Sequence, residues 1–170
     1  MDTTKKNTIT FIPHAGRLFI NDFQNMVNKV LEKWEGQESL LFKHHIPAVQ
    51  LAYRLQDLHH KGLLHVYDVQ VGDSEPILGG LLGCGVGSLW WIEGDVLIEE
   101  LVVSLTGTNY GFGRFAIEEM ERMALMKQCV LILTGSSMFK KTQLITNMYR
   151  KKGFEVYGES YLKEVTPHDA

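Results

Sequence analysis

The first third of the chain contains two stretches in which apolar side chains recur every three or four residues. This spacing is typical of amphipathic helices, and it predicts one helix from Phe19 to Trp34 and another from Pro47 to His60. Gly36 and Gly62 are expected to end these helices. The stretch Thr8–Ile12, which precedes both, alternates and is rich in β-forming residues, so it predicts a short strand.

From residue 63 onwards the apolar positions follow a shorter period, which is typical of strands. Five glycines lie in the second of the predicted strands, and they indicate a β-bulge or the close approach of another backbone. Trp90 and Trp91 are expected near the end of this strand, facing opposite sides of it. Three antiparallel strands are predicted, at Leu63–Val71, Ile77–Ile92 and Val96–Ser104. The turns Gly72–Pro76 and Glu93–Asp95 connect them in that order.

The rest of the chain alternates between helices and strands. Connected antiparallel strands followed by strand–helix–strand units predict an α+β fold, with a mixed, mostly antiparallel sheet and helices on both faces. We expect one domain over residues 1–170, with an N-terminal part at 8–62 and a sheet core at 63–165. The expected elements are a loop at Leu105–Gly113, a helix at Arg114–Lys127, a strand at Val130–Thr134, a helix at Thr142–Lys152 and a strand at Phe154–Leu162.

Composition narrows the range of functions. The chain has 170 residues, of which 45% are hydrophobic and 22% charged, and these shares are close to those of globular proteins. A formal charge of −3 argues against nucleic acid as the main partner. No apolar stretch reaches membrane-spanning length and the opening residues lack the apolar core of a secretory signal. We therefore expect a cytoplasmic protein that does not contact a membrane.

The cysteines and histidines do not have the spacing of metal ligands. Cys84 and Cys129 lie far apart, each in an apolar run, so free thiols are expected rather than a disulfide. The pairs at 44–45 and 59–60 lack the histidine spacing of a metalloprotease, and no second cysteine lies near either thiol. No metal site is expected.

The segment Val102–Arg114 places a glycine-bearing loop between a strand and a helix. Glycine lets backbone N–H groups approach an anion closely, and a helix N-terminus adds partial positive charge. This combination suits a pyrophosphate, although an ordinary turn has the same appearance. The fuller dinucleotide fingerprint is absent, because the position of its third glycine is Ala116 and no early parallel strand precedes the loop.

Two segments in this part of the chain resemble the signatures of the GNAT family of N-acetyltransferases. The first resembles the family's acyl-CoA loop, Arg/Gln-x-x-Gly-x-Gly/Ala, with Gly111 and Gly113 on its two glycines and Val103 on the valine of the preceding strand. The second, Asn147–Phe154, resembles the family's Tyr-x-x-x-Gly-Phe helix end. The two segments stand in the family's order, and the spacing between them fits one helix, one strand and one further helix.

The resemblance implies an N-acyltransferase that moves an acetyl group from acetyl-CoA to a primary amine by direct attack in a ternary complex. The amine belongs to a small molecule or a protein, and a homodimer is compatible with the family. Backbone groups of Val103 and Leu105 would pair with the pantetheine arm. The coenzyme-binding residues that the resemblance implies are Val102, Val103, Ser104, Thr108, Asn109, Tyr110, Gly111, Phe112, Gly113, Arg114, Thr142 and Tyr149.

The same resemblance implies catalytic roles. Tyr149 stands where the family places its general acid, and the ordinary pKa of a tyrosine, about 10, lies above the roughly 8.5 of a thiol. Its alternative role is to pack the helix onto the sheet. An acidic residue often lies on the strand before the loop in the family, so Glu99 and, slightly less favoured, Glu100 are the candidate bases. A purely solvated carboxylate is an equal alternative for either residue. Only one of them can face the cleft, because neighbouring strand residues alternate.

The sequence departs from the family pattern at two positions and leaves other functions open. Thr108 stands where the family usually has Arg or Gln, and Thr142 where Asn is common. The alternative function is therefore a module with this fold that binds acyl-CoA or a protein without turnover. An enzyme for a longer acyl chain is a third reading. One of Trp90 and Trp91 is expected in the core, and lining the acceptor cleft is the less favoured role for the other.

Overall fold

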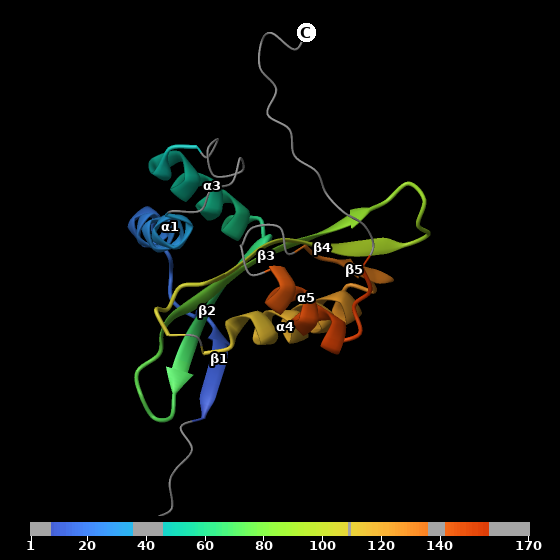
Figure 1. The fold of residues 1–170 in the computed structure, drawn as a ribbon. Coiled ribbons are helices and arrows are strands. Elements are labelled where there is room, and N and C mark those ends of the chain that lie inside the picture. Colours follow the sequence, from blue (N-terminus) through green and yellow to red (C-terminus); the bar gives the residue numbers. More distant parts are fainter. Residues whose placement is uncertain (1–7, 36–45, 109, 136–141, 157–170) are drawn as a thin grey trace, which may run out of the picture.

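The computed structural model describes residues 8–35, 46–108, 110–135 and 142–156. Five strands form one sheet, and helices cover both of its faces (Figure 1). The elements are β1 (Ile9–Pro13), α1 (Ile20–Trp34), α3 (Ala48–His60), β2 (Leu64–Val71), β3 (Ile77–Ser88), β4 (Asp95–Ser104), α4 (Phe112–Met126), β5 (Leu131–Leu133) and α5 (Thr142–Lys151).

The sheet has the strand order β1-β2-β3-β4-β5. Each of the first four strands pairs antiparallel with its neighbour, whereas β5 runs parallel to β4. A parallel neighbour needs a crossover connection, and α4 supplies it. The predicted α+β fold with a mixed, mostly antiparallel sheet is confirmed.

Two separate hydrophobic cores lie on the two faces of the sheet. Leu81 belongs to the core beneath α1 and α3, and its neighbour Leu82 belongs to the core beneath α4 and α5. This division follows from the alternation of side chains along β3. Full burial of such a side chain contributes about 1.5–3 kcal/mol, so both cores hold the helices firmly against the sheet.

The predicted helices agree closely with the structure. α1 begins after Phe19, whose backbone N–H donates to the Asp22 carboxylate at 2.7 Å. This contact satisfies one of the unpaired donors of the first turn and places negative charge at the helix N-terminus. α4 begins at Phe112 rather than at the predicted Arg114, so Gly113 lies inside the helix.

The predicted second strand is too long. β3 ends at Ser88, and Trp90 and Trp91 lie in the following turn, so the prediction that they face opposite sides of a strand is wrong. Their rings contact each other edge to face at 5.2 Å, and Trp90 is 92% exposed. Of the predicted closing strand Phe154–Leu162, residues 154–156 are not in a strand and the others lie outside the described residues.

The expected irregularities in the glycine-rich strand are confirmed. The register between β2 and β3 shifts at Tyr67/Asp68 and leaves Gly79 as an extra residue. The next residue, Gly80, faces α4 so closely that an added Cβ would lie 2.4 Å from the Phe112 ring. A glycine is needed here because the first turn of α4 packs directly on the β3 backbone.

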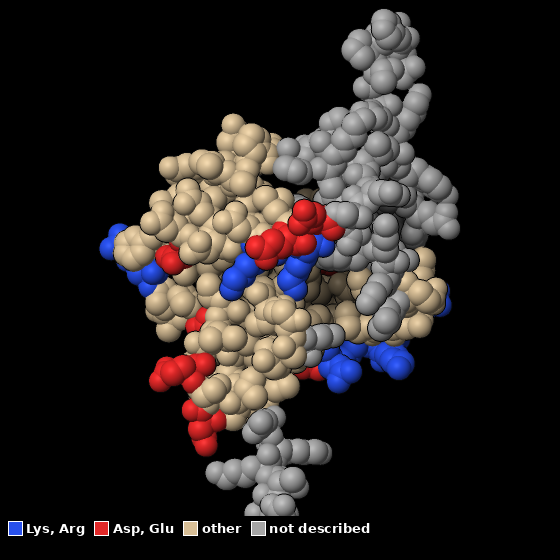
Figure 2. Space-filling view, turned by 60° about the vertical axis from the view of Figure 1, so that its left-hand side comes forward, with Lys and Arg blue, Asp and Glu red and all other residues tan. Residues whose placement is uncertain are grey.

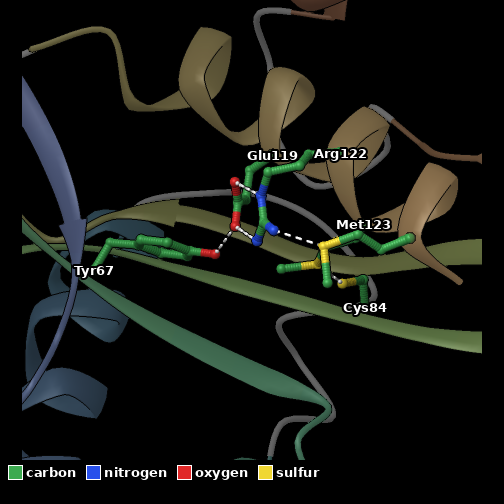
Figure 3. Close-up of polar contacts among 6 residues, drawn as sticks. Tyr67, Cys84, Glu119, Arg122 and Met123 are labelled. Carbon is green, nitrogen blue, oxygen red and sulfur yellow. Dashed lines mark hydrogen bonds and ion pairs between the residues drawn. The ribbon is translucent and has the colours of Figure 1, made fainter.

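A polar cluster also joins the sheet to α4 (Figure 3). The buried Tyr67 of β2 donates its hydroxyl hydrogen to Glu119 at 2.9 Å, and Arg122 donates to the same carboxylate. Burial, and then the bond to Glu119, raises the pKa of Tyr67. Beside this cluster Cys84 is buried, and both Cys84 and Cys129 are free thiols as predicted.

The surface carries charges of both signs. On the face shown in Figure 2, basic and acidic side chains lie next to one another in the middle of the view. Acidic side chains also lie at the lower left and basic ones at the lower right. Among the described residues, none of the helices has the length and apolar character that crossing a membrane requires.

Candidate functional site

Strands β4 and β5 pair over only a short length. They are hydrogen-bonded over three residue pairs, of which Ile98 with Leu133 is the last. β4 then continues to Ser104, whereas β5 ends. The residue that follows this last pair is Glu99 on β4 and Thr134 after β5, so the parallel register brings these two side by side where the pairing ends.

A β-bulge lies at the same place. Gly83 pairs with Leu101 and Cys84 pairs with Glu99, so Glu100 is an extra residue on β4. A bulge bends its strand and redirects the side chains around it. Glu99 is half-buried and Glu100 is exposed. The two carboxylates therefore have different environments, and Glu99 is the one that contacts other side chains of the site.

Three side chains from three elements meet at this point. The Thr134 hydroxyl lies 2.7 Å from the Tyr149 hydroxyl and is also hydrogen-bonded to Glu99 Oε2. Tyr149 donates to the same Oε2 at 3.2 Å, and the Gly135 N–H donates to it at 3.4 Å. Thr134 has a single hydroxyl hydrogen, so it donates to Glu99 or to Tyr149 but not to both at once.

The surroundings favour the protonated form of Tyr149. Burial, followed by the negative charge of Glu99, raises the pKa of its phenol. Its ring also packs against Phe154, with ring centroids 5.2 Å apart. The site thus combines a carboxyl group with a phenol that its surroundings keep in the protonated form.

The glycine loop leads into the N-terminus of α4. Gly111 is the N-cap residue with φ 86° and ψ 24°, in the left-handed region that glycine adopts without strain. The first turn of a helix leaves backbone N–H groups without intrahelical partners, which suits an anion. Gly113 lies against α5, since an added Cβ would be 3.4 Å from Met148 Cε.

Side chains between β4 and Gly111 fold the loop. The hydroxyls of Ser104 and Thr106 lie 3.0 Å apart, and Thr106 donates to the Thr108 carbonyl at 2.7 Å. Lys33, in the last turn of α1, donates to the Thr106 carbonyl at 3.1 Å. A positive charge from the opposite side of the sheet therefore lies at the edge of this loop.

The sequence matches no protein-family model and no curated protein. Its fold, in contrast, is similar to that of solved acetyltransferases. An acetyltransferase from Trypanosoma brucei is 14% identical, with a TM-score of 0.60 over 93% of this chain and 100% of the other. An aminoglycoside N-acetyltransferase solved in complex with CoA is 11% identical, with a TM-score of 0.62 over 96% and 98%. This chain has the GNAT fold.

The GNAT fold is also similar to that of a Bacillus halodurans protein described as a transcriptional regulator. That structure is 15% identical, with a TM-score of 0.63 over 93% of this chain and 100% of the other. Proteins with different descriptions thus share this architecture. The function of this chain has to be argued from its own residues.

Within the GNAT fold, the residues predicted to bind a coenzyme occupy several environments. The side chains of Val103 and Phe112 are buried in the two cores, so only their backbone is available to a ligand. Val102, Ser104 and Tyr110 are half-buried, while Thr108 and Arg114 are exposed. Asn109 lies outside the described residues, and Thr142 is the first residue of α5.

One expectation about the pantetheine arm needs correction. The Leu105 backbone N–H donates to the Gly79 carbonyl at 2.9 Å, so it is already used within the sheet. Val103 pairs with Leu81 of β3. Among the described residues, the backbone edge of β4 that lacks a paired strand is the opposite one, beyond Ile98.

Sequence reasoning missed Thr134 and Lys33. Thr134 follows a three-residue strand, and Lys33 lies in the last turn of an amphipathic helix, so neither belongs to a recognisable motif. Only the β4–β5 register and the packing of α1 bring them to the site. Among the described residues, no group of three or more His, Cys, Asp or Glu side chains is arranged to hold a metal ion.

Proposed function

We propose that the protein is an N-acyltransferase that moves an acetyl group from acetyl-CoA to a primary amine. The observation that supports this most directly is the end of the β4–β5 pairing just before Glu99 and Thr134, with the Tyr149 hydroxyl hydrogen-bonded to both of these side chains. Because β5 ends there, the edge of β4 beyond Ile98 has no hydrogen-bonded strand on this side among the described residues, and acid–base side chains lie where this unpaired edge, the β4–β5 gap, begins.

The donor fits this gap. Beyond Ile98, β4 has no hydrogen-bonded strand on the β5 side among the described residues. An extended pantetheine arm carries amide groups, so it can pair with that edge in the manner of an added strand. Its pyrophosphate then lies toward the N-terminus of α4, where the turn at Gly111 and the first-turn N–H groups favour negative charge.

The proposed reaction is a direct transfer. The amine nitrogen attacks the thioester carbonyl, the new C–N bond forms, and the C–S bond breaks. Glu99 accepts the proton that the amine loses, and Tyr149 gives its hydroxyl proton to the departing thiolate. The burial that raises the pKa of Tyr149 favours the phenol that holds this proton before the transfer, and the hydrogen bond from the phenol stabilises the thiolate as it forms.

Solved structures with the same fold support the choice of donor. Two aminoglycoside N-acetyltransferase structures contain CoA or a bisubstrate analogue joined to CoA. A predicted acetyltransferase from Clostridium acetobutylicum contains acetyl-CoA, at 12% identity and a TM-score of 0.58. At such identities the likeness concerns the fold, so the activity has to be tested on this protein directly.

The first experiment is calorimetric titration of the purified protein with acetyl-CoA and with free CoA. Saturable binding with a dissociation constant in the micromolar range is expected. Thiol release from acetyl-CoA is then measured with a panel of amines: spermidine, a lysine-containing peptide and kanamycin. Binding of neither coenzyme to the folded protein would overturn the donor assignment. Binding without thiol release from any amine would overturn the transferase.

A further inference from the structure

The Thr134 hydroxyl lies between the proposed acid and the proposed base, yet the transfer described above does not use it. It is hydrogen-bonded to Glu99 Oε2 and lies 2.7 Å from the Tyr149 oxygen. A hydroxyl is both a donor and an acceptor, so it can receive a proton on one side and release one on the other. That property is what a proton relay requires.

The contact through Thr134 is better than the direct one. Hydrogen bonds between two oxygens usually measure 2.5–3.0 Å. The 2.7 Å distance from Thr134 to Tyr149 lies in the middle of this range, whereas the 3.2 Å from Tyr149 to Glu99 lies outside it. The favourable path between acid and base therefore runs through the threonine.

One turnover leaves the site in the wrong protonation state for the next. Glu99 has gained a proton from the amine, and Tyr149 has lost one to the thiolate. The phenolate form of the half-buried Tyr149 is unfavourable in free energy, because burial disfavours the charged form. Rapid turnover requires a route by which the proton on Glu99 reaches the oxygen of Tyr149.

We propose that Thr134 is that route, and this inference rests on the proposed function. The protonated Glu99 carboxyl donates its hydrogen to Thr134 Oγ while the Thr134 hydroxyl hydrogen passes to the Tyr149 oxygen. One O–H bond forms and one breaks at each step, so Glu99 returns to a carboxylate and Tyr149 to a phenol. No external acid or base is consumed.

The fold supplies this arrangement. Glu99 lies on β4, Thr134 directly follows β5 and Tyr149 lies on α5. The parallel pairing of Ile98 with Leu133 fixes Thr134 beside Glu99. Thr134 contacts the two reacting side chains rather than the substrates, so it is a positioning residue.

The test compares two variants of Thr134. Thr134→Val removes the hydroxyl at nearly constant shape, whereas Thr134→Ser keeps it. With the best amine of the panel, Thr134→Val is expected to lower kcat at least about tenfold, while Thr134→Ser stays within about threefold of the wild type. The KM for acetyl-CoA is expected to stay within about twofold in both. Thr10→Val, at an exposed position of β1, is the control for replacing a threonine by valine outside the site.

A second readout separates a relay from a structural role. Increasing concentrations of imidazole, a small proton carrier, are expected to restore kcat of Thr134→Val without raising that of the wild type. Equal kcat for Thr134→Val and the wild type would overturn the relay. Equal loss in the Val and Ser variants, or a Val variant that imidazole does not rescue, would also overturn it. A wild-type protein that releases no thiol would instead refute the proposed function.

Discussion

The hydroxyl of Tyr149 is a single group on which the proposed chemistry depends. Replacing Tyr149 by Phe removes the proton donor but keeps the ring that packs on Phe154. We expect kcat to fall by about 10²–10⁴-fold with little change in the affinity for acetyl-CoA. Steady-state kinetics and calorimetry measure the two effects separately.

Tyr67→Phe is the matched control for this substitution. It also removes a tyrosine hydroxyl that is hydrogen-bonded to a glutamate, but the pair joins β2 to α4 rather than lying at the β4–β5 gap. We expect it to cost about 1 kcal/mol of stability and to leave kcat unchanged. A normal kcat for Tyr149→Phe would remove the acid role from Tyr149.

At the scale of a residue, the sequence was informative where a motif existed. Gly111 and Tyr149 were predicted because they stand at the spacing of the two motifs. Strand alternation showed that only one of Glu99 and Glu100 can face the cleft, but not which one. The bulge then decided which carboxylate meets other side chains, since it leaves Glu100 without a partner position on β3. A bulge changes the phase of a strand, and hydrophobic alternation does not reveal where it falls.

The start of α4 depends on a backbone conformation that few residues adopt. Gly111 has φ 86°, so Gly111→Val is strained whatever space surrounds it. We expect this variant to lose CoA binding while unfolding remains cooperative, because the N–H groups of the first turn are displaced. Gly111→Asn is the matched control, since Asn tolerates the left-handed region better. Calorimetric titration of both variants makes the test, and wild-type affinity in the Val variant would place the coenzyme elsewhere.

The packing of α4 on β3 gives a second prediction for an element. In Gly80→Ala the new methyl group would lie 2.4 Å from the Phe112 ring, so the first turn of α4 has to move. We expect a loss of about 1–3 kcal/mol in the free energy of unfolding, together with weaker CoA binding. Gly107→Ala, where an added Cβ meets nothing within 4 Å, is the stability control. Urea unfolding measures the stability of both variants. Equal free energies of unfolding for Gly80→Ala and Gly107→Ala would contradict the prediction.

Helices were easier to predict than strands for a physical reason. The three-to-four-residue period of α1 extends over fifteen residues, which averages out local exceptions. In β3 the hydrophobic run continues through Leu89–Ile92, although the hydrogen-bonded ladder ends at Ser88. Hydrophobicity alone shows that a segment is apolar, but it does not show where pairing with the next strand stops.

For the whole molecule, the buried phenols predict how stability depends on pH. Burial raises the pKa of both Tyr67 and Tyr149 above the ordinary value of about 10. Glu119 raises the pKa of Tyr67 further, and Glu99 does the same for Tyr149. In the unfolded chain both phenols ionise near that value. The stability they contribute is therefore complete below about pH 10 and is lost as the pH rises further.

Urea unfolding at pH 8 and at pH 10.5 measures this effect. We expect a lower free energy of unfolding at the higher pH, and a smaller loss in Tyr67→Phe because one of the two buried phenols is gone. An equal loss in that variant and the wild type would show that Tyr67 does not account for the alkaline instability. The comparison requires that both proteins unfold in two states.

The fold class and the order of the described elements were predictable from the sequence, whereas the site was predictable only in part. Period and turn residues indicated the order of the elements from β1 to α5, and two motifs indicated the donor. The acceptor leaves no such pattern, because its contacts come from side chains that distant elements bring together. Lys33 and Thr134 illustrate the difficulty, since each has an ordinary place in its own element.

The short pairing of β4 with β5 has a consequence for how this chain tolerates change in length. Deleting one residue from the connection at 127–130 would shift β5 by one position, so Gly135 would stand beside Glu99 and Thr134 would turn to the other face. A deletion in the exposed turn at 72–76 would move no such partner. Sequences that evolve from this one should therefore vary freely in length at the turn at 72–76. They should keep the length of the connection at 127–130 constant, even where its amino acids are substituted.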